Sequence, residues 1–136
     1  MFKRWAARSA AKAATPPPGE AAEQRALAHL QACGLQLLQR NYRVARGPGA
    51  RAGEIDLVMH DPRDGTLVFV EVRARASQRA GGAAASVGAA KRQRLVLAAQ
   101  HYLLRLDKVP PCRFDVVAID GEQIEWIAAA FEAPSW

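Results

Sequence analysis

Residues 53–73 read GEIDLVMHDPRDGTLVFVEVR, and this stretch decides the fold. Two apolar runs flank residues 61–65 (DPRDG), a combination of residue types that favours a tight turn. The pattern predicts two antiparallel strands joined as a hairpin. Asp56 and Glu71 lie 15 positions apart, one in each run. An ionised carboxylate among Val, Ile and Phe is costly to bury unless something compensates its charge.

A divalent cation would compensate two such carboxylates. Side chains alternate along a strand, so Glu71 and Arg73 emerge on one face of the second run. If the hairpin register places Asp56 on the same face, two carboxylates and a cationic side chain converge. Register cannot be read from sequence alone, so this convergence is a hypothesis. In a basic protein, a divalent cation held by two acids indicates phosphodiester chemistry.

The rest of the chain predicts a sheet flanked by helices in the order α-β-β-β-α-β-β, an α/β fold of the mixed α+β kind. The expected elements are a helix at 20–33, strands at 35–44, 53–60 and 66–75, a helix at 86–106, and strands at 112–120 and 123–127. Residues 1–18 end in three prolines and are expected to form a disordered basic tail. Residues 19–136 are long enough for a single domain with its own core.

Each predicted helix carries one polar residue on its apolar stripe. Glu23 falls at helical spacing with Leu27 and Leu30, which should face the sheet. Lys91 falls on the stripe of Leu95, in the first turns of the second helix. The positive field of a helix N-terminus favours phosphate there. Both Glu23 and Lys91 are therefore candidates to join the two acids, with ordinary solvated positions as the alternative.

Composition narrows the class of protein. The formal net charge is +6, and 15 of the 19 basic residues are Arg, which contacts phosphate in a bidentate manner. Coding bias towards Ala and Arg is the alternative explanation. No apolar run approaches the ~18 residues of a membrane span, and no signal peptide is visible, so we expect a cytoplasmic protein. Cys33 and Cys112 lack metal-ligand spacing and are expected to be buried, inert thiols.

Five features occur in a characteristic order: Glu23, GEIDL at 53–57, VFVEVR at 68–73, Lys91 and RFDVV at 113–117. In this order they resemble the YraN-like family of small bacterial proteins, over roughly residues 19–130. That family is similar to the restriction-endonuclease-like superfamily, whose nucleases carry a proline-aspartate followed by an acid-x-lysine pattern. Within the superfamily it resembles the archaeal Holliday-junction resolvases. The resemblance implies a restriction-endonuclease-like core.

The resemblance also implies a metal site. Asp56 and Glu71 take the roles of the two acids, and with the backbone carbonyl of Val72 they would hold Mg²⁺ or Mn²⁺. Glu23 matches the helix-one glutamate of the resolvases and would add a ligand, through water or at a second ion. The metal would activate a water and neutralise the phosphate under attack. Because four-way junctions are cut symmetrically, the resemblance further implies a homodimer.

The sequence departs from the superfamily pattern at two positions. Arg73 stands where the motif lysine would be, and its guanidinium stays protonated, so it can clamp a phosphate but cannot act as a base. Lys91 could supply the missing ammonium group. Ile55 replaces the proline before Asp56, which the superfamily tolerates. We therefore expect Asp56, Glu71, Arg73, Lys91 and Glu23 to form the catalytic set.

Three hypotheses follow for the function. The first is a metal-dependent endonuclease acting on DNA, with branched or otherwise structured DNA as the substrate. The second is a nucleic-acid-binding module of the same fold without catalysis, which Arg73 favours. The third is an interaction protein whose acids have no chemical role. An alternative to the endonuclease hypothesis is that Glu71 and Arg73 form an exposed ion pair on a solvated face of the strand. Asp115 is expected to be structural.

Overall fold

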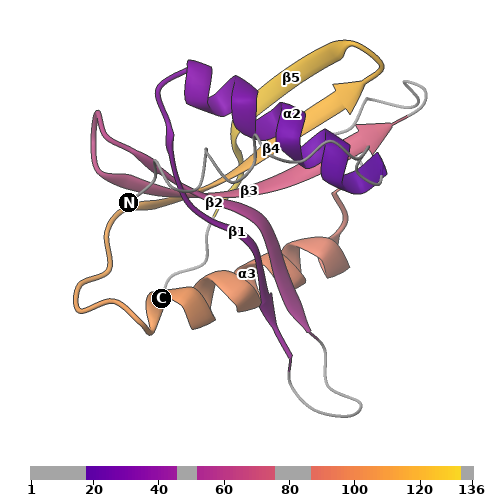
Figure 1. Cartoon of the computed structure of the whole chain (residues 1–136). Coiled ribbons are helices and arrows are strands. Elements are labelled where there is room, and N and C mark those ends of the chain that lie inside the picture. The colour runs from indigo at the N-terminus through magenta and orange to yellow at the C-terminus, as the bar shows by residue number, and fades with distance from the viewer. Residues whose placement is uncertain (1–17, 46–51, 76–86, 133–136) are drawn as a thin grey trace, which may run out of the picture.

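The computed structural model describes residues 18–45, 52–75 and 87–132 of the chain. The elements are α2 (Pro18–Ala32), β1 (Gln36–Val44), β2 (Gly53–Asp61), β3 (Thr66–Arg75), α3 (Ala89–Leu103), β4 (Cys112–Asp120) and β5 (Gln123–Phe131). This confirms the α/β class and the order α-β-β-β-α-β-β. The strands form one sheet in the order β1-β2-β3-β4-β5, in which only β3 and β4 run parallel (Figure 1).

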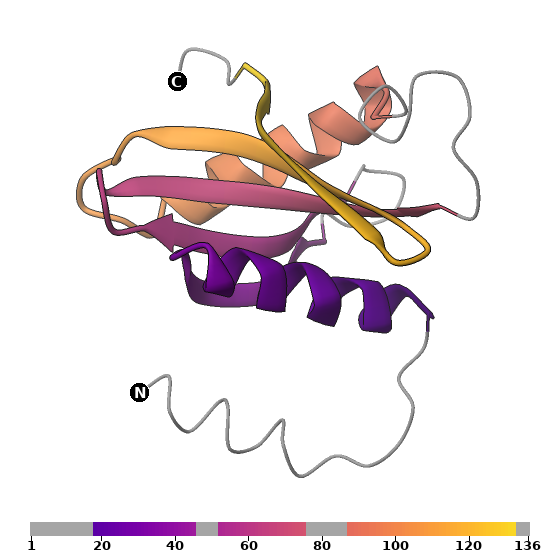
Figure 2. The ribbon, with the colours of Figure 1, turned by 90° about the horizontal axis from the view of Figure 1, so that it is seen from above.

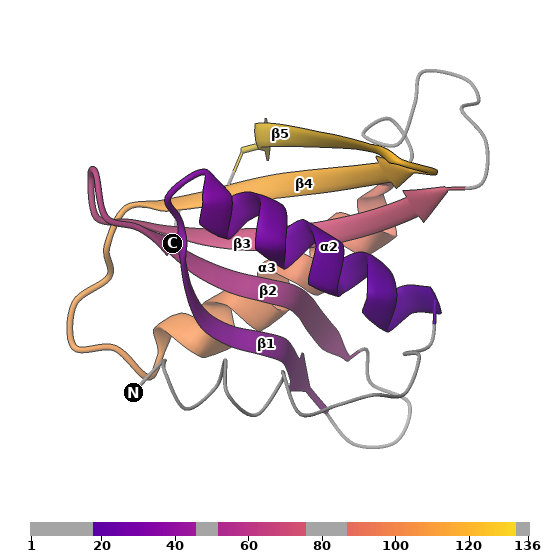
Figure 3. The same cartoon turned by 45° about the horizontal axis from the view of Figure 1, so that its top comes forward.

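The sheet lies between the two helices. Seen from above, α2 covers one face and α3 the other (Figure 2), and Figure 3 shows α2 crossing in front of the strands with α3 behind them. Leu30 and Val70 belong to the apolar cluster under α2, and Phe69, Leu95 and Phe114 to the cluster under α3. Each fully buried side chain of this size contributes roughly 1.5–3 kcal/mol to folding. The central strands are thus buried on both faces.

The first helix begins earlier than predicted. It starts at Pro18, inside the segment expected to be a tail, because proline suits the first helical position, where the missing N–H has no role. The helix ends at Ala32, one residue before the predicted end, and Gly34, the predicted stop, has a φ of +103°, which suits glycine. The amides of Gly34 and Leu35 donate to the carbonyls of Gln31 and Leu30. The predicted disorder of the tail concerns residues 1–17, which lie outside the described residues.

Other boundaries also differ from the prediction. The second helix was expected from residue 86, but it begins at Ala89, after Gly88 in an extended conformation. The second helix ends at Leu103, three residues early. Leu104, which falls within the predicted range of 86–106, lies beyond the end of the helix and is 82% exposed. The last strand continues to Phe131, four residues beyond the predicted end. The prediction stopped early because the alanines at 128–130 have a low propensity for strands. The predicted burial of Cys33 is wrong, since this thiol is exposed in the turn after α2.

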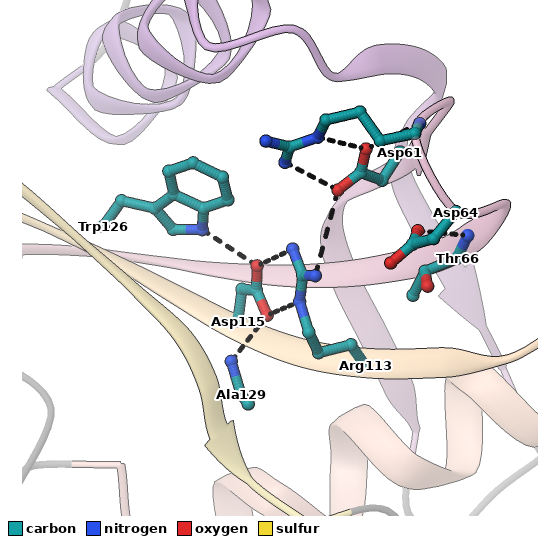
Figure 4. Close-up of polar contacts among 8 residues, drawn as sticks. Asp61, Asp64, Thr66, Arg113, Asp115, Trp126 and Ala129 are labelled. Atoms are coloured by element: carbon teal, nitrogen blue, oxygen red, sulfur yellow. Dashed lines mark hydrogen bonds and ion pairs between the residues drawn. The ribbon is translucent and has the colours of Figure 1, made fainter.

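A polar network closes the end of the sheet that lies near the β2–β3 turn (Figure 4). Asp115, buried on β4, accepts hydrogen bonds from Arg113 Nε and Nη2 at 2.9 Å each. It also accepts from Trp126 Nε1 at 2.8 Å and from the Ala129 amide at 2.9 Å. Arg113 Nη1 lies 4.0 Å from Asp61 Oδ2. Asp115 is therefore fully engaged within the fold, which confirms its predicted structural role.

No helix among the described residues has both the length and the apolar character needed to cross a membrane.

Candidate active site

The two candidate acids lie where the pairing of β2 with β3 ends. The pairs between these strands run from the turn to Leu57 opposite Val70. One residue further, Asp56 Oδ2 accepts a hydrogen bond from the Val72 amide at 2.8 Å. A side-chain carboxylate thus takes the place of a backbone acceptor. Figure 1 shows β1 and β2 bending away from β3 beyond this point.

The same point breaks the alternation expected along β2. Ile55 packs in the cluster under α3, whereas Leu57 packs in the cluster under α2. Two residues on one face of a regular strand would share a cluster. The strand therefore turns at Asp56, and the carboxylate enters the opening between β2 and β3.

Asp56 and Glu71 interact directly with each other. Their side chains are hydrogen-bonded to each other. Burial, and then the negative charge of Asp56, raise the pKa of Glu71 to about 7. Burial also raises the pKa of Asp56, although the hydrogen bond from Val72 opposes that rise. Glu71 is buried and Asp56 is half-buried, and the charge of Asp56 disfavours ionisation of Glu71, so a cation would stabilise the ionised pair.

Two basic side chains reach Glu71. Lys91 Nζ, from the first turn of α3, lies 3.4 Å from Glu71 Oε2. Arg73 Nη1 lies 3.9 Å from the same oxygen. Glu71 itself is only 4% exposed. The reading of Glu71 and Arg73 as a solvated surface pair is therefore wrong, and four predicted residues, Asp56 among them, come together.

Glu23 approaches from the other face of the sheet. Burial, and then the charge of Asp56, raise the pKa of Glu23. Arg40 Nη2 lies 4.0 Å away, and Asn41 donates a hydrogen bond to the Glu23 carboxylate. Among the described residues, no three acidic, histidine or cysteine side chains are grouped to hold one metal ion. Glu23 is therefore near Asp56 without completing a three-residue ligand set with it and Glu71.

Sequence reasoning missed Asn41. It lies on β1 between the residues that pair with Leu57 and Ile55, and so opposite Asp56. Its φ is +51°, a left-handed conformation that Asn tolerates better than most residues. The available signal was an Asn in the middle of a predicted strand, where Asn is uncommon. This conformation accompanies the hydrogen bond from Asn41 to Glu23.

Sequence reasoning also missed Arg43 and Arg94, which flank Glu54 at the start of β2. Arg94 Nη2 lies 3.5 Å from Glu54 Oε1, and Arg43 Nε lies 3.5 Å from Glu54 Oε2. A cavity of about 10 Å³ is lined by Glu54, Glu71, Lys91, Arg94 and Leu95. This volume holds about one water molecule, so the Glu54 cluster directly adjoins the Glu71–Lys91 pair.

The donor atoms fit a hard divalent cation. Asp56 and Glu71 offer adjacent carboxylate oxygens, and Mg²⁺ is commonly held by one or two carboxylates together with water and substrate phosphate. Asp56 Oδ2 accepts a hydrogen bond from the Val72 amide, which fixes the orientation of the carboxylate. Burial raises the pKa of both acids, and a bound cation would stabilise their ionised forms.

The chain is similar to proteins that share one family description, UPF0102. The model of the family described as "Uncharacterised protein family UPF0102" matches residues 22–119. A UPF0102 protein of Paracidovorax citrulli (strain AAC00-1) is 62% identical over 125 residues, covering 92% of this chain and 90% of the relative. One of Methylibium petroleiphilum is 62% identical over 119 residues, covering 88% and 97%. One of Cupriavidus taiwanensis is 57% identical over 115 residues, covering 85% and 82%.

Proposed function

The chain belongs to the uncharacterised protein family UPF0102, the YraN family that its motifs resemble, and we propose that it is a metal-dependent DNA endonuclease. Its reaction would be hydrolysis of phosphodiester bonds, with branched or otherwise structured DNA as the expected substrate. One observation carries the proposal. The buried Glu71 and the half-buried Asp56 form a hydrogen-bonded pair where the pairing of β2 with β3 ends, and Lys91 Nζ lies 3.4 Å from Glu71.

The metal would be Mg²⁺ or Mn²⁺. Asp56, Glu71 and the backbone carbonyl of Val72 would hold it, and Glu23 would act through water. When bound, the ion supplies an acidified water and neutralises phosphate charge. Because the pKa of Glu71 is about 7, protons compete with the ion, and affinity should rise as pH increases towards 8.

The two basic residues would act on the substrate phosphate. Lys91 Nζ, beside Glu71, can donate to a phosphate oxygen and offset the charge that develops on it. Arg73 stays protonated and can clamp the same group, but it cannot take a proton from water. In this proposal Lys91 fills the place of the motif lysine from a different element, α3 instead of β3.

The partner and the location follow from the same chemistry. A formal charge of +6, carried mostly by Arg, supports binding to a polyanion such as DNA. An activity on DNA belongs in the cytoplasm, in line with the sequence-based expectation. The homodimer implied by the resolvase resemblance stays a prediction.

A cleavage assay tests the proposal. Linear duplex, flapped and four-way-junction DNA are incubated with the protein in Mn²⁺, Mg²⁺ or EDTA. We expect metal-dependent cutting that is lost in Asp56→Ala and Glu71→Gln and strongly reduced in Lys91→Ala. Glu125→Gln removes an exposed carboxylate on β5 and is the matched control. Cutting that persists in EDTA or in Asp56→Ala contradicts the proposal.

Arg73 favours one other function, a nucleic-acid-binding module without catalysis. The motif position that usually holds a lysine carries a side chain that cannot act as a base. If wild type and Asp56→Ala bind the same DNA with equal affinity and neither cuts it in any metal, this second function replaces the first.

A further inference from the structure

Three charged side chains at the rim of the candidate site have no role in the proposed reaction. Arg43 from β1 and Arg94 from α3 flank Glu54 from β2, each 3.5 Å from a different carboxylate oxygen. Their side chains are 70%, 41% and 31% exposed, in the order Arg43, Arg94, Glu54. Three separate elements thus present one solvent-facing cluster, which we call the Arg43–Glu54–Arg94 cluster.

Close packing of β2 on α3 assembles this cluster. A Cβ at Gly53 would lie 2.8 Å from the Ala98 amide nitrogen and 3.0 Å from the Arg94 carbonyl oxygen. Such distances are too short for any larger residue, so glycine lets the strand approach the helix backbone here. The next residue, Glu54, is therefore held within reach of Arg94. The contact between Glu54 and Arg94 is fixed by the backbone as well as by charge.

The Arg43–Glu54–Arg94 cluster lies next to Lys91 of the candidate site. The cavity of about 10 Å³ has Glu54 and Arg94 on its wall together with Glu71 and Lys91. Only about one water fits between the two groups. From Lys91 to Arg94 and on to Arg43, cationic side chains form a row leading away from the acids towards the edge strand β1.

We propose that Arg43 and Arg94, oriented by Glu54, bind the phosphodiester backbone of the substrate strand beside the position where it is cut. The proposal rests on the proposed function. A guanidinium carries five N–H donors, and each Arg gives Glu54 one contact at the long distance of 3.5 Å. The remaining donors can contact phosphate oxygens in the bidentate manner that Arg favours. Glu54 is then a positioning residue.

Two roles for Glu54, neutralising the arginines or orienting them, predict opposite effects of its removal on DNA affinity. If Glu54 only neutralises the arginines, its removal adds positive potential and tightens DNA binding. If Glu54 orients them, Glu54→Gln weakens binding, because a carboxamide has one acceptor oxygen and cannot serve both guanidinium groups. The sign of the change in affinity therefore separates the two roles.

The experiment measures binding of the full-length protein to a fluorescein-labelled DNA duplex in EDTA, across a series of salt concentrations. The variants are Arg43→Ala, Arg94→Ala and Glu54→Gln. Lys108→Ala and Asp107→Asn are the charge-matched controls, since both residues are exposed beyond the far end of α3. Thermal unfolding checks that each variant is folded.

Log K for DNA binding falls as log salt rises. We expect Arg43→Ala and Arg94→Ala each to make this slope less steep by about 0.9. At 0.1 M salt, one lost phosphate contact corresponds to about eightfold weaker binding. Glu54→Gln should also weaken binding, whereas Asp107→Asn should tighten it slightly and Lys108→Ala should leave the slope nearly unchanged.

Two results would overturn the inference, and they differ from failure of the proposed function. Glu54→Gln binding as tightly as Asp107→Asn would remove the positioning role. Slopes for Arg43→Ala and Arg94→Ala equal to that of Lys108→Ala would remove the phosphate contacts. In both cases the wild type still binds DNA in a salt-dependent manner. A wild type that binds no DNA overturns the proposed function itself, and the inference with it.

Discussion

Replacing Glu71 with Gln tests the buried acid pair without changing the shape of the side chain. The pKa of Glu71 rises from its ordinary value of 4.5 to about 7 in the folded protein. Between these values the folded chain holds a proton that the unfolded chain has lost. The associated stability is therefore fully present below pH 4.5 and is lost as pH rises through 7.

The size of the effect follows from the pKa difference. One pKa unit corresponds to about 1.4 kcal/mol, so the full linkage is about 3 kcal/mol. Between pH 5 and pH 8 we expect the free energy of unfolding of the wild type to fall by roughly 2–3 kcal/mol in EDTA. Glu71→Gln cannot ionise, so it should escape this loss and be the more stable protein at pH 8.

Urea unfolding at pH 5 and pH 8, followed by tryptophan fluorescence, measures this difference. Asp56 also has a raised pKa and remains in both proteins, so the comparison reports Glu71 together with its effect on Asp56. The pKa of Asp61 is lowered to about 2 by hydrogen bonds from Arg63, and this group titrates outside the window. Glu125→Gln, on the exposed side of β5, is the control and should follow the wild type.

Adding Mn²⁺ at pH 8 extends the test to the metal. An ion bound between Asp56 and Glu71 should raise wild-type stability by about 2.7 kcal/mol at 100 times its dissociation constant. Glu71→Gln should gain much less. If wild type and Glu71→Gln lose the same stability between pH 5 and pH 8, the reasoning about the buried pair is refuted, whatever Mn²⁺ does.

Three other substitutions probe the frame around the site. Gly53→Ala should lower the free energy of unfolding by about 1–3 kcal/mol in urea, because its Cβ would meet the Ala98 nitrogen at 2.8 Å; unchanged stability would contradict the close packing. Asp115→Asn should cost about 2–3 kcal/mol in thermal unfolding and leave Mn²⁺ affinity unchanged, since its charged hydrogen bonds are structural. Asn41→Gly should be nearly neutral in stability, whereas Asn41→Val should lose about 1–2 kcal/mol, because φ is +51°; equal stabilities would argue against the left-handed backbone.

Local patterns made much of the fold predictable. The alternation in β2 and β3 and the turn between them fixed the hairpin, and Gly34 fixed the end of α2. The parallel pairing of β3 with β4 was not predicted, because no residue in either strand specifies its partner or direction. The end of β5 could not be predicted, because alanine side chains carry little information about strands.

The acids of the site were predictable, and their surroundings were not. Asp56 and Glu71 stood out because carboxylates are rare in apolar strands. Arg43 and Arg94 did not stand out, because an Arg on an exposed strand or helix face looks like any solvated charge. Their contacts with Glu54 depend on the register of β1 against β2 and on the close packing at Gly53. Both are tertiary properties.

The hydrogen bond from the Ala129 amide to Asp115, at a register shift of β5 against β4, has a consequence for how the molecules behave towards one another. β5 is an edge strand, and residues 126–131 (WIAAAF) carry no charge. An uncharged apolar edge can template pairing with another chain and so promote aggregation. Here the φ of Ala129 is +52°, and its amide is bonded to Asp115 instead of pointing outward for a neighbour. Asp115 thereby withdraws one backbone donor from the open edge of the sheet, where a strand of another chain would need it.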